Sequence, residues 1–118
     1  INYCRQVRIN SVLDMLNVEF PFEVLQKLSQ MPDIIMLHRT VDEREENKDK
    51  EMPWTEIEKI KNVYDNVFVA VAGGETIKEV NSGFFNGADI VVVWQLINEN
   101  YPEGKQLIED FLRENELR

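Results

Sequence analysis

The chain has 118 residues, of which 43% are hydrophobic and 30% charged, and its formal net charge at pH 7 is −9. This length and balance are typical of one folded domain, residues 1–118, rather than of a disordered chain. The negative charge would repel a nucleic-acid backbone or an anionic membrane, and no apolar run reaches the roughly 20 residues of a membrane span, so we expect neither partner.

The chain begins with Ile rather than Met, which predicts a fragment, a processed chain or an atypical recombinant form. Residues 1–8 are typical of the end of a helix or of a frayed leader, and their mixed, polar character predicts no signal peptide. Cys4 is the only cysteine. A lone thiol cannot form an internal disulfide, so we expect a cytoplasmic protein in which Cys4 is a packed or unused thiol rather than a nucleophile.

The first half of the chain predicts two strands around one helix. An apolar segment that contains a single carboxylate, Asp14, predicts a strand near Ser11–Leu16. A proline suited to a first helical turn and an apolar stripe at helical spacing predict a helix over Pro21–Gln30. The strand Ile34–Leu37 follows and runs directly into His38, the only histidine in the sequence.

A charged segment, Arg39–Met52, comes next and is interpreted either as a solvated loop or as a lid over a site. Pro53 then opens a helix that closes at Asn62–Asn66, with Trp54, Ile57, Ile60 and Tyr64 on one apolar face. The β-branched run Val67–Ala72 predicts a third strand, buried on both faces of the sheet.

The last third of the chain predicts two more helices and a fourth strand. The segment Thr76–Glu79 has the form of a capping box and marks a helix start, whereas Asn86-Gly87 marks its end. The fourth strand is expected at Ile90–Val93, and the last helix begins at Tyr101–Glu103. The residues expected to face inward from these two helices are Ile77, Val80 and Phe84, and Leu107, Ile108, Phe111 and Leu112.

Four strand–helix units in strict alternation predict an α/β protein with parallel strands and right-handed crossovers. Four parallel strands leave two bare edges in an open sheet. We therefore expect either a doubly wound sheet or half of a (β/α)8 TIM barrel, completed by another chain or by a missing segment.

His38 is the leading candidate for chemistry, because an imidazole at the end of a buried strand can move protons near neutral pH. A structural histidine is the alternative. Arg39 could bind a phosphate or pair with a loop acid. Asp42 could orient His38, bind a polar group of a substrate or cap the loop.

Two further signals precede and follow His38. Asp14 is a carboxylate in an otherwise apolar strand, which is costly unless it is paired or used, so we favour a functional role. Gly73-Gly74 lies between a buried strand and a capped helix, where backbone amides suit an anion. A tight strand–helix turn would require glycine equally.

Four motifs in order resemble one family: Val12–Val18, His38-Arg39-Thr40-Val41-Asp42, the helix start Pro53-Trp54, and Val71-Ala72-Gly73-Gly74. Together they resemble the C-terminal half of 3-hexulose-6-phosphate synthase, in the type that carries His-Arg in its motif. This family belongs to the orotidine-monophosphate decarboxylase superfamily, whose fold is a (β/α)8 barrel. The resemblance runs from Ile9 to Leu117 and implies barrel strands five to eight.

A sister family, 3-keto-L-gulonate-6-phosphate decarboxylase, also carries His-Arg at this place. Asp14, Val41 and Ala72 are the choices of the synthase, whereas the decarboxylases have Glu, Arg and Thr there. The resemblance thus implies an aldolase-type lyase that interconverts formaldehyde plus ribulose 5-phosphate with a hexulose 6-phosphate. A decarboxylase of the sister type is one alternative.

The resemblance also implies roles for particular residues. His38 would shuttle protons beside a Mg²⁺-stabilised enediolate, and Asp14 would shape the pocket or bind the substrate. The implied catalytic residues are Asp14, His38, Arg39 and Asp42, and the implied substrate-binding residues are Ala72, Gly73, Gly74 and Gln95.

Two departures from the family pattern keep a non-enzymatic interpretation open. The Asp-x-Lys-x-x-Asp motif that supplies the metal ligand and the catalytic lysine would precede residue 1. Trp94-Gln95 also stand where the family usually has glycine followed by arginine or a small residue, so Trp94 either fills the phosphate site or packs at the barrel mouth. The other hypothesis is therefore a half-barrel assembly or sugar-phosphate-binding module, and in both cases we expect a homodimer.

Overall fold

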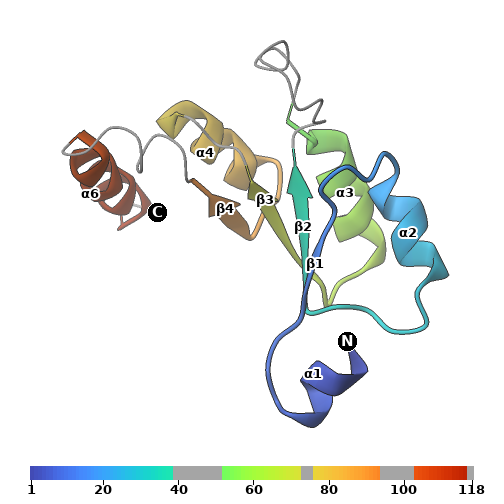
Figure 1. Cartoon of the computed structure of the whole chain (residues 1–118). Coiled ribbons are helices and arrows are strands. Elements are labelled where there is room, and N and C mark those ends of the chain that lie inside the picture. The colour runs from blue at the N-terminus through green and yellow to red at the C-terminus, as the bar shows by residue number, and fades with distance from the viewer. Residues whose placement is uncertain (39–51, 73–75, 94–102, 117–118) are drawn as a thin grey trace.

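The computed structural model describes residues 1–38, 52–72, 76–93 and 103–116. Four parallel strands form one sheet in the order β1-β2-β3-β4, and helices alternate with them along the chain, as Figure 1 shows. The architecture is an α/β fold resembling half of a barrel, which confirms the expected fold class. No described helix is both long enough and apolar enough to cross a membrane.

The predicted strands and helices are present, and several are shorter than the sequence suggested, whereas β2 extends one residue further than expected, to His38. The strand expected near Ser11–Leu16 is limited to three residues, and the helix expected to reach Gln30 ends at Lys27, because Leu28 takes an extended conformation. The bounds are α1 Asn2–Gln6, β1 Val12–Asp14, α2 Pro21–Lys27, β2 Ile34–His38, α3 Trp54–Val63, β3 Phe68–Ala72, α4 Ile77–Phe85, β4 Ile90–Val92 and α6 Glu103–Glu116.

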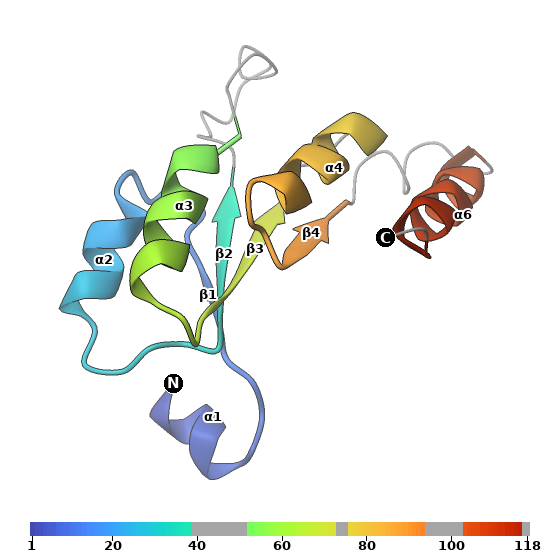
Figure 2. The same ribbon diagram turned by 180° about the vertical axis from the view of Figure 1, so that it is seen from behind.

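Helices α2, α3 and α4 all cover the same face of the sheet, which is clearest when Figures 1 and 2 are compared. The core lies in this layer, because alternate residues of β2 and β3 point toward the helices. Ile35 and Val69 are fully buried there against Ile57 and Ile60 of α3 and Leu25 of α2. The predicted apolar face of α3 is thus confirmed.

Among the described helices, none covers the opposite face of the sheet in either view (Figures 1 and 2). Val12, Phe68 and Ile90 lie on this open face and are 52%, 58% and 37% exposed. The prediction that the third strand is buried on both faces holds for its centre, where Ala70 is 1% exposed. It is wrong for Phe68, because nothing in the described part of the chain covers that end of the open face.

Helix α4 packs closely on β4 through a glycine. A Cβ atom added at Gly83 would lie 2.9 Å from Cγ2 of Val91, so only glycine allows this approach without a shift. The helix begins as predicted, with the Thr76 hydroxyl accepting a hydrogen bond from the Glu79 amide at 3.2 Å. It ends at the expected stop, where Gly87 has a φ of 96°.

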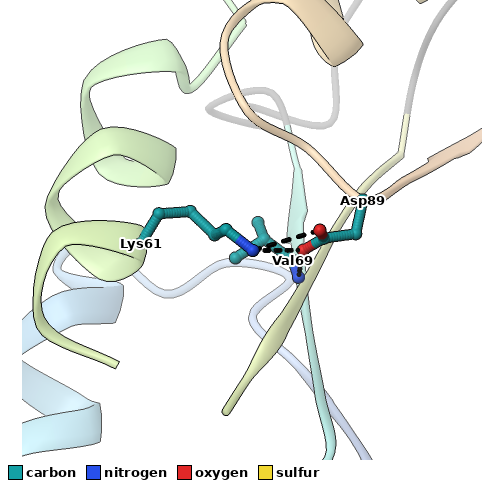
Figure 3. Close-up of polar contacts among 3 residues, drawn as sticks. All are labelled: Lys61, Val69 and Asp89. Carbon is teal, nitrogen blue, oxygen red and sulfur yellow. Dashed lines mark hydrogen bonds and ion pairs between the residues drawn. The ribbon is translucent and has the colours of Figure 1, made fainter. Parts of the chain in front are cut away.

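At the amino ends of the strands, aspartates link neighbouring strands. The Asp33 carboxylate accepts hydrogen bonds from the Ser11 amide and hydroxyl at 2.7 and 3.0 Å. Asp89 accepts one from the Val69 amide at 2.8 Å and also pairs with Lys61 of α3, as Figure 3 shows. These contacts join β1 to β2 and α3 to β3 and β4.

The last helix differs from its predicted packing. Phe111 is buried as expected and Leu107 is half-buried, but Ile108 and Leu112 are 39% and 60% exposed. The prediction of four inward residues is wrong for these two. Residues 107 and 111 share one face of a helix at i, i+4 spacing, and α6 lies beyond β4 and α4 (Figure 1), so only a narrow stripe is covered.

Candidate functional site

Asp14 and His38 are the last residues of β1 and β2, so both lie at the carboxyl edge of the sheet. Asp14 of β1 is the register partner of Met36 of β2. His38 lies two residues after Met36 in β2, so the side chains of His38 and Asp14 lie on the same face of the sheet. The Nε2 atom of His38 lies 2.5 Å from Oδ1 of Asp14. The structure thus brings together two residues that the sequence marked separately.

The turn after β1 also holds the carboxylate. Oδ1 of Asp14 accepts a second hydrogen bond, from the Leu16 amide at 2.9 Å. The Val18 amide donates to the Met15 carbonyl at 3.0 Å, and Asn17 between them has a left-handed backbone with a φ of 61°. Local hydrogen bonds of this kind, from a backbone amide two residues on, are typical of aspartate at turns.

The pair has the geometry of a proton-transfer site. The side chain of His38 is 20% exposed and that of Asp14 is 52% exposed, so the imidazole is mostly enclosed while the carboxylate faces solvent. With the carboxylate ionised, Nε2 of His38 is the donor to Asp14 and Nδ1 is left to accept a proton. This arrangement fixes the tautomer of the imidazole, which a general base requires.

Ala72 lies beside the pair. It is the register partner of His38 on β3, so its side chain shares the open face of the sheet with the imidazole. The other predicted site residues lie outside the described residues, namely Arg39, Asp42, Gly73, Gly74 and Gln95, together with Val41 and Trp94.

The described residues do not by themselves fit a divalent metal. Among them, no three His, Cys, Asp or Glu side chains are placed to hold one ion, and Asp14 and His38 contribute only two groups. Mg²⁺ prefers octahedral oxygen coordination, whereas half of this pair is an imidazole. The Mg²⁺ ligands implied by the family resemblance therefore stay a prediction that falls outside these residues.

A separate hollow of about 490 Å³ lies on helix α4 and is lined by Ile77, Lys78, Asn81, Ser82 and Phe85. Of the predicted site residues that the structure describes, Asp14, His38 and Ala72, none borders it. It is an open depression on one helix, and we assign it no chemistry.

Two features of the site were not predicted from the sequence. Asp42 was considered as a partner for His38, but the described contact is with Asp14. The left-handed turn at Asn17 was not predicted either. The available signal was the spacing Asp-x-x-Asn directly after an apolar run, because asparagine tolerates a left-handed backbone better than most residues do.

Comparisons with known proteins give a consistent set of relatives. The chain is 38% identical over 112 residues to a protein of Methanothrix thermoacetophila, 36% over 112 residues to one of Methanosarcina barkeri, and 37% over 102 residues to one of Archaeoglobus fulgidus. These homologues are bifunctional enzymes, Fae/Hps.

The three matches cover 95%, 95% and 84% of this chain but only 27%, 27% and 25% of the relatives. The chain thus spans about a quarter of the length of the relatives it matches. No family model and no solved structure matches the sequence.

Proposed function

We propose that the chain is part of an aldolase-type lyase of the 3-hexulose-6-phosphate synthase kind, which interconverts formaldehyde plus ribulose 5-phosphate with a hexulose 6-phosphate. The contact between His38 and Asp14 at the carboxyl edge of a parallel sheet is the observation that carries this proposal. The second part of the relatives' name, Hps, agrees with the four motifs that resemble this family.

The chemistry needs one group that takes and returns a proton. In the cleavage direction, Nδ1 of His38 accepts the proton of the terminal hydroxyl, the bond between the first two carbons breaks, and formaldehyde leaves. The bonding electron pair passes to the second carbon, next to the carbonyl, and this carbon takes the proton back to give ribulose 5-phosphate. Asp14 keeps Nε2 protonated and stabilises the imidazolium between these steps.

The remaining roles are carried over from the family resemblance. Arg39, Asp42 and Ala72 would complete the pocket around the pair, whereas Gly73, Gly74 and Gln95 would bind the sugar phosphate. A Mg²⁺ ion would act as a Lewis acid toward the substrate oxygens, with ligands from outside the described residues. We further propose that the four strands form half of a (β/α)8 barrel in a cytoplasmic protein.

A chimera tests the proposal most directly. This chain replaces the matched 112-residue segment of the Methanothrix thermoacetophila relative, and formaldehyde consumption is measured with ribulose 5-phosphate and Mg²⁺. We expect activity in the chimera and a loss of about 100-fold or more in its His38→Asn variant, because general acid–base catalysis typically contributes 10²–10⁴-fold.

A control variant separates chemistry from folding. Lys105→Gln changes a side chain that is 71% exposed on α6 and should leave the rate of the chimera unchanged. A folded chimera without activity, or a His38→Asn variant with the rate of its parent, would contradict the assignment of the lyase to this segment.

The same chimera also tests the alternative activity, that of a 3-keto-L-gulonate-6-phosphate decarboxylase. Asp14 and Ala72 are the residues of the synthase at two of the positions that separate the two families. We therefore expect carbon dioxide release from 3-keto-L-gulonate 6-phosphate to be slower than formaldehyde consumption. The reverse order would favour the decarboxylase.

A second candidate function is a non-catalytic half-barrel module that assembles as a homodimer. The exposure of Val12, Phe68 and Ile90 on the open face of the sheet favours it. Two copies could place β4 of one beside β1 of the other and cover both bare edges at once. The measurement that separates this candidate is the mass of the chain in solution.

A further inference from the structure

Two non-glycine residues in the described part of the chain have a left-handed backbone, Arg8 with a φ of 59° and Asn17 with a φ of 61°. Arg8 lies before β1, at the amino end of the sheet, and Asn17 lies after it, at the carboxyl end beside Asp14. Such a conformation is unfavourable for residues with a Cβ and is least so for asparagine and aspartate. The left-handed backbone of Asn17, next to the candidate site, therefore needs a physical explanation.

We propose that Asn17 is a positioning residue, whose left-handed turn holds the Asp14 carboxylate in the orientation that keeps Nε2 of His38 protonated. This inference deepens the proposed function, since it concerns the same pair. It concerns a state of the imidazole that can be measured without substrate.

The argument starts from the Asp14 oxygen. Oδ1 accepts from the Leu16 amide at 2.9 Å and contacts Nε2 of His38 at 2.5 Å, so one atom is held from two sides. The Leu16 amide points back toward Asp14 because the chain reverses at residues 15–18, where the Val18 amide bonds to the Met15 carbonyl. A left-handed residue 17 is part of that reversal.

Asn17 is exposed, so its side chain contributes little packing. The main effect of a substitution at this position is therefore on the backbone conformation of the turn. A β-branched residue opposes a positive φ, so valine should open the turn and release the Leu16 amide. Asp14 would then be free to rotate, because half of its side chain already faces solvent.

Nitrogen-15 NMR of the imidazole in the full chain tests this. His38 is the only histidine, so its two ring nitrogens are read without assignment of others. At a pH where the imidazole is neutral, we expect shifts of a protonated Nε2 and an unprotonated Nδ1 at their limiting values. In Asn17→Val, both shifts should move toward the averaged values of a solvent-exposed histidine, as they should in Asp14→Asn.

Two matched variants separate positioning from general destabilisation. Asn17→Gly accepts a positive φ without strain and should keep the parent shifts. Arg8→Val introduces the same strain at the other end of β1 and should leave the imidazole shifts unchanged. Asn17→Ala gives the milder form of the change if the valine variant does not fold.

The proposal is overturned if Asn17→Val and Asn17→Ala keep the parent shifts, or if Arg8→Val moves them as far. A parent whose shifts already match those of Asp14→Asn would overturn it too, because the pair would then not form in solution. A folded chimera without lyase activity would instead count against the proposed function alone. The inference on Asn17 would still stand if the imidazole shifts of the full chain and its variants are those expected here.

Discussion

The Asp14 carboxylate accepts hydrogen bonds from a backbone amide and from an imidazole through a single oxygen atom. The sequence predicted a role for Asp14 because an isolated carboxylate in an apolar strand needs a partner. It did not identify that partner, since the contact with His38 depends on the register between β1 and β2, which no local pattern encodes. Candidate residues could thus be predicted, but not their pairing.

Asp33 is the residue whose titration should influence folding. The Ser11 amide, then the Ser11 hydroxyl, and to a lesser extent the charge of Arg5, hold the pKa of the Asp33 carboxyl below its ordinary value. Because the pKa is lower in the folded state, the ionised group stabilises the fold above the unfolded pKa of about 3.9, and this contribution is lost as the pH falls through the folded value.

We therefore expect Asp33→Asn to lower the thermal midpoint by a constant amount above about pH 5 and by progressively less toward about pH 2. Circular dichroism melts of parent and variant across this range measure the difference. Ser11→Ala, which removes one of the donors, should show part of the same loss. A difference between parent and Asp33→Asn that does not change with pH would show that the shifted carboxyl is not its source.

At the scale of elements, hydrophobic periodicity and the signals for helix starts and stops predicted most of the fold. The capping hydroxyl of Thr76 and the stop at Gly87 placed α4 within a residue, because each signal is a local conformational requirement. The helix α6 was predicted with too wide an apolar face, since exposure of Leu112 depends on what lies beside the helix. Local signals set element ends, whereas burial depends on neighbours that the sequence pattern does not name.

The packing of α4 on β4 should be sensitive to volume at Gly83. We expect Gly83→Val to reduce the free energy of unfolding by about 1–3 kcal/mol, because its side chain meets Val91 at a distance that requires a shift. Urea unfolding measures the change. Lys78→Val, on an exposed position of the same helix, lowers the intrinsic helix propensity, whereas Gly83→Val raises it, so a larger loss at Gly83 can come only from the clash. A loss at Gly83 that is no larger than the loss at Lys78 would argue against close packing there.

The two contacts of Asp89, with the Val69 amide and with Lys61, should contribute unequally to the free energy of unfolding. Asp89→Ala leaves the Val69 amide without its acceptor and should cost about 1–3 kcal/mol of unfolding free energy. Lys61→Met removes a partly exposed ion pair and should cost about 0–1 kcal/mol. Urea unfolding of both variants checks the order, and a larger loss for Lys61→Met would mean that the ion pair, not the amide acceptor, joins these elements.

At the scale of the whole molecule, the sheet is covered on one face only within the described residues (Figure 2). The sequence predicted the two bare edges, because alternating strand–helix units with parallel strands leave them unpaired. It left open whether helices cover one face of the sheet or both. The sequence could not establish what covers the open face, since that depends on groups beyond these elements. Exposed apolar side chains such as Phe68 make association the physical expectation.

For the half-barrel module, we expect a concentration-dependent dimer in sedimentation experiments. Each chain carries a formal charge of −9, so salt should strengthen association by screening the repulsion between copies. Phe68→Ser should weaken the dimer, whereas Leu112→Ser, on an exposed position of α6, should not. A monomer at all concentrations and salt levels would exclude this assembly.

The central claim is that Asp14 and His38 act as one unit in proton transfer. A double-mutant cycle in the chimera measures this most directly, through kcat/KM for the parent, Asp14→Asn, His38→Asn and the double variant. The account predicts that each single change lowers kcat/KM and that the double variant is no slower than His38→Asn. Losses that multiply in the double variant, or an Asp14→Asn variant as fast as the parent, would contradict it.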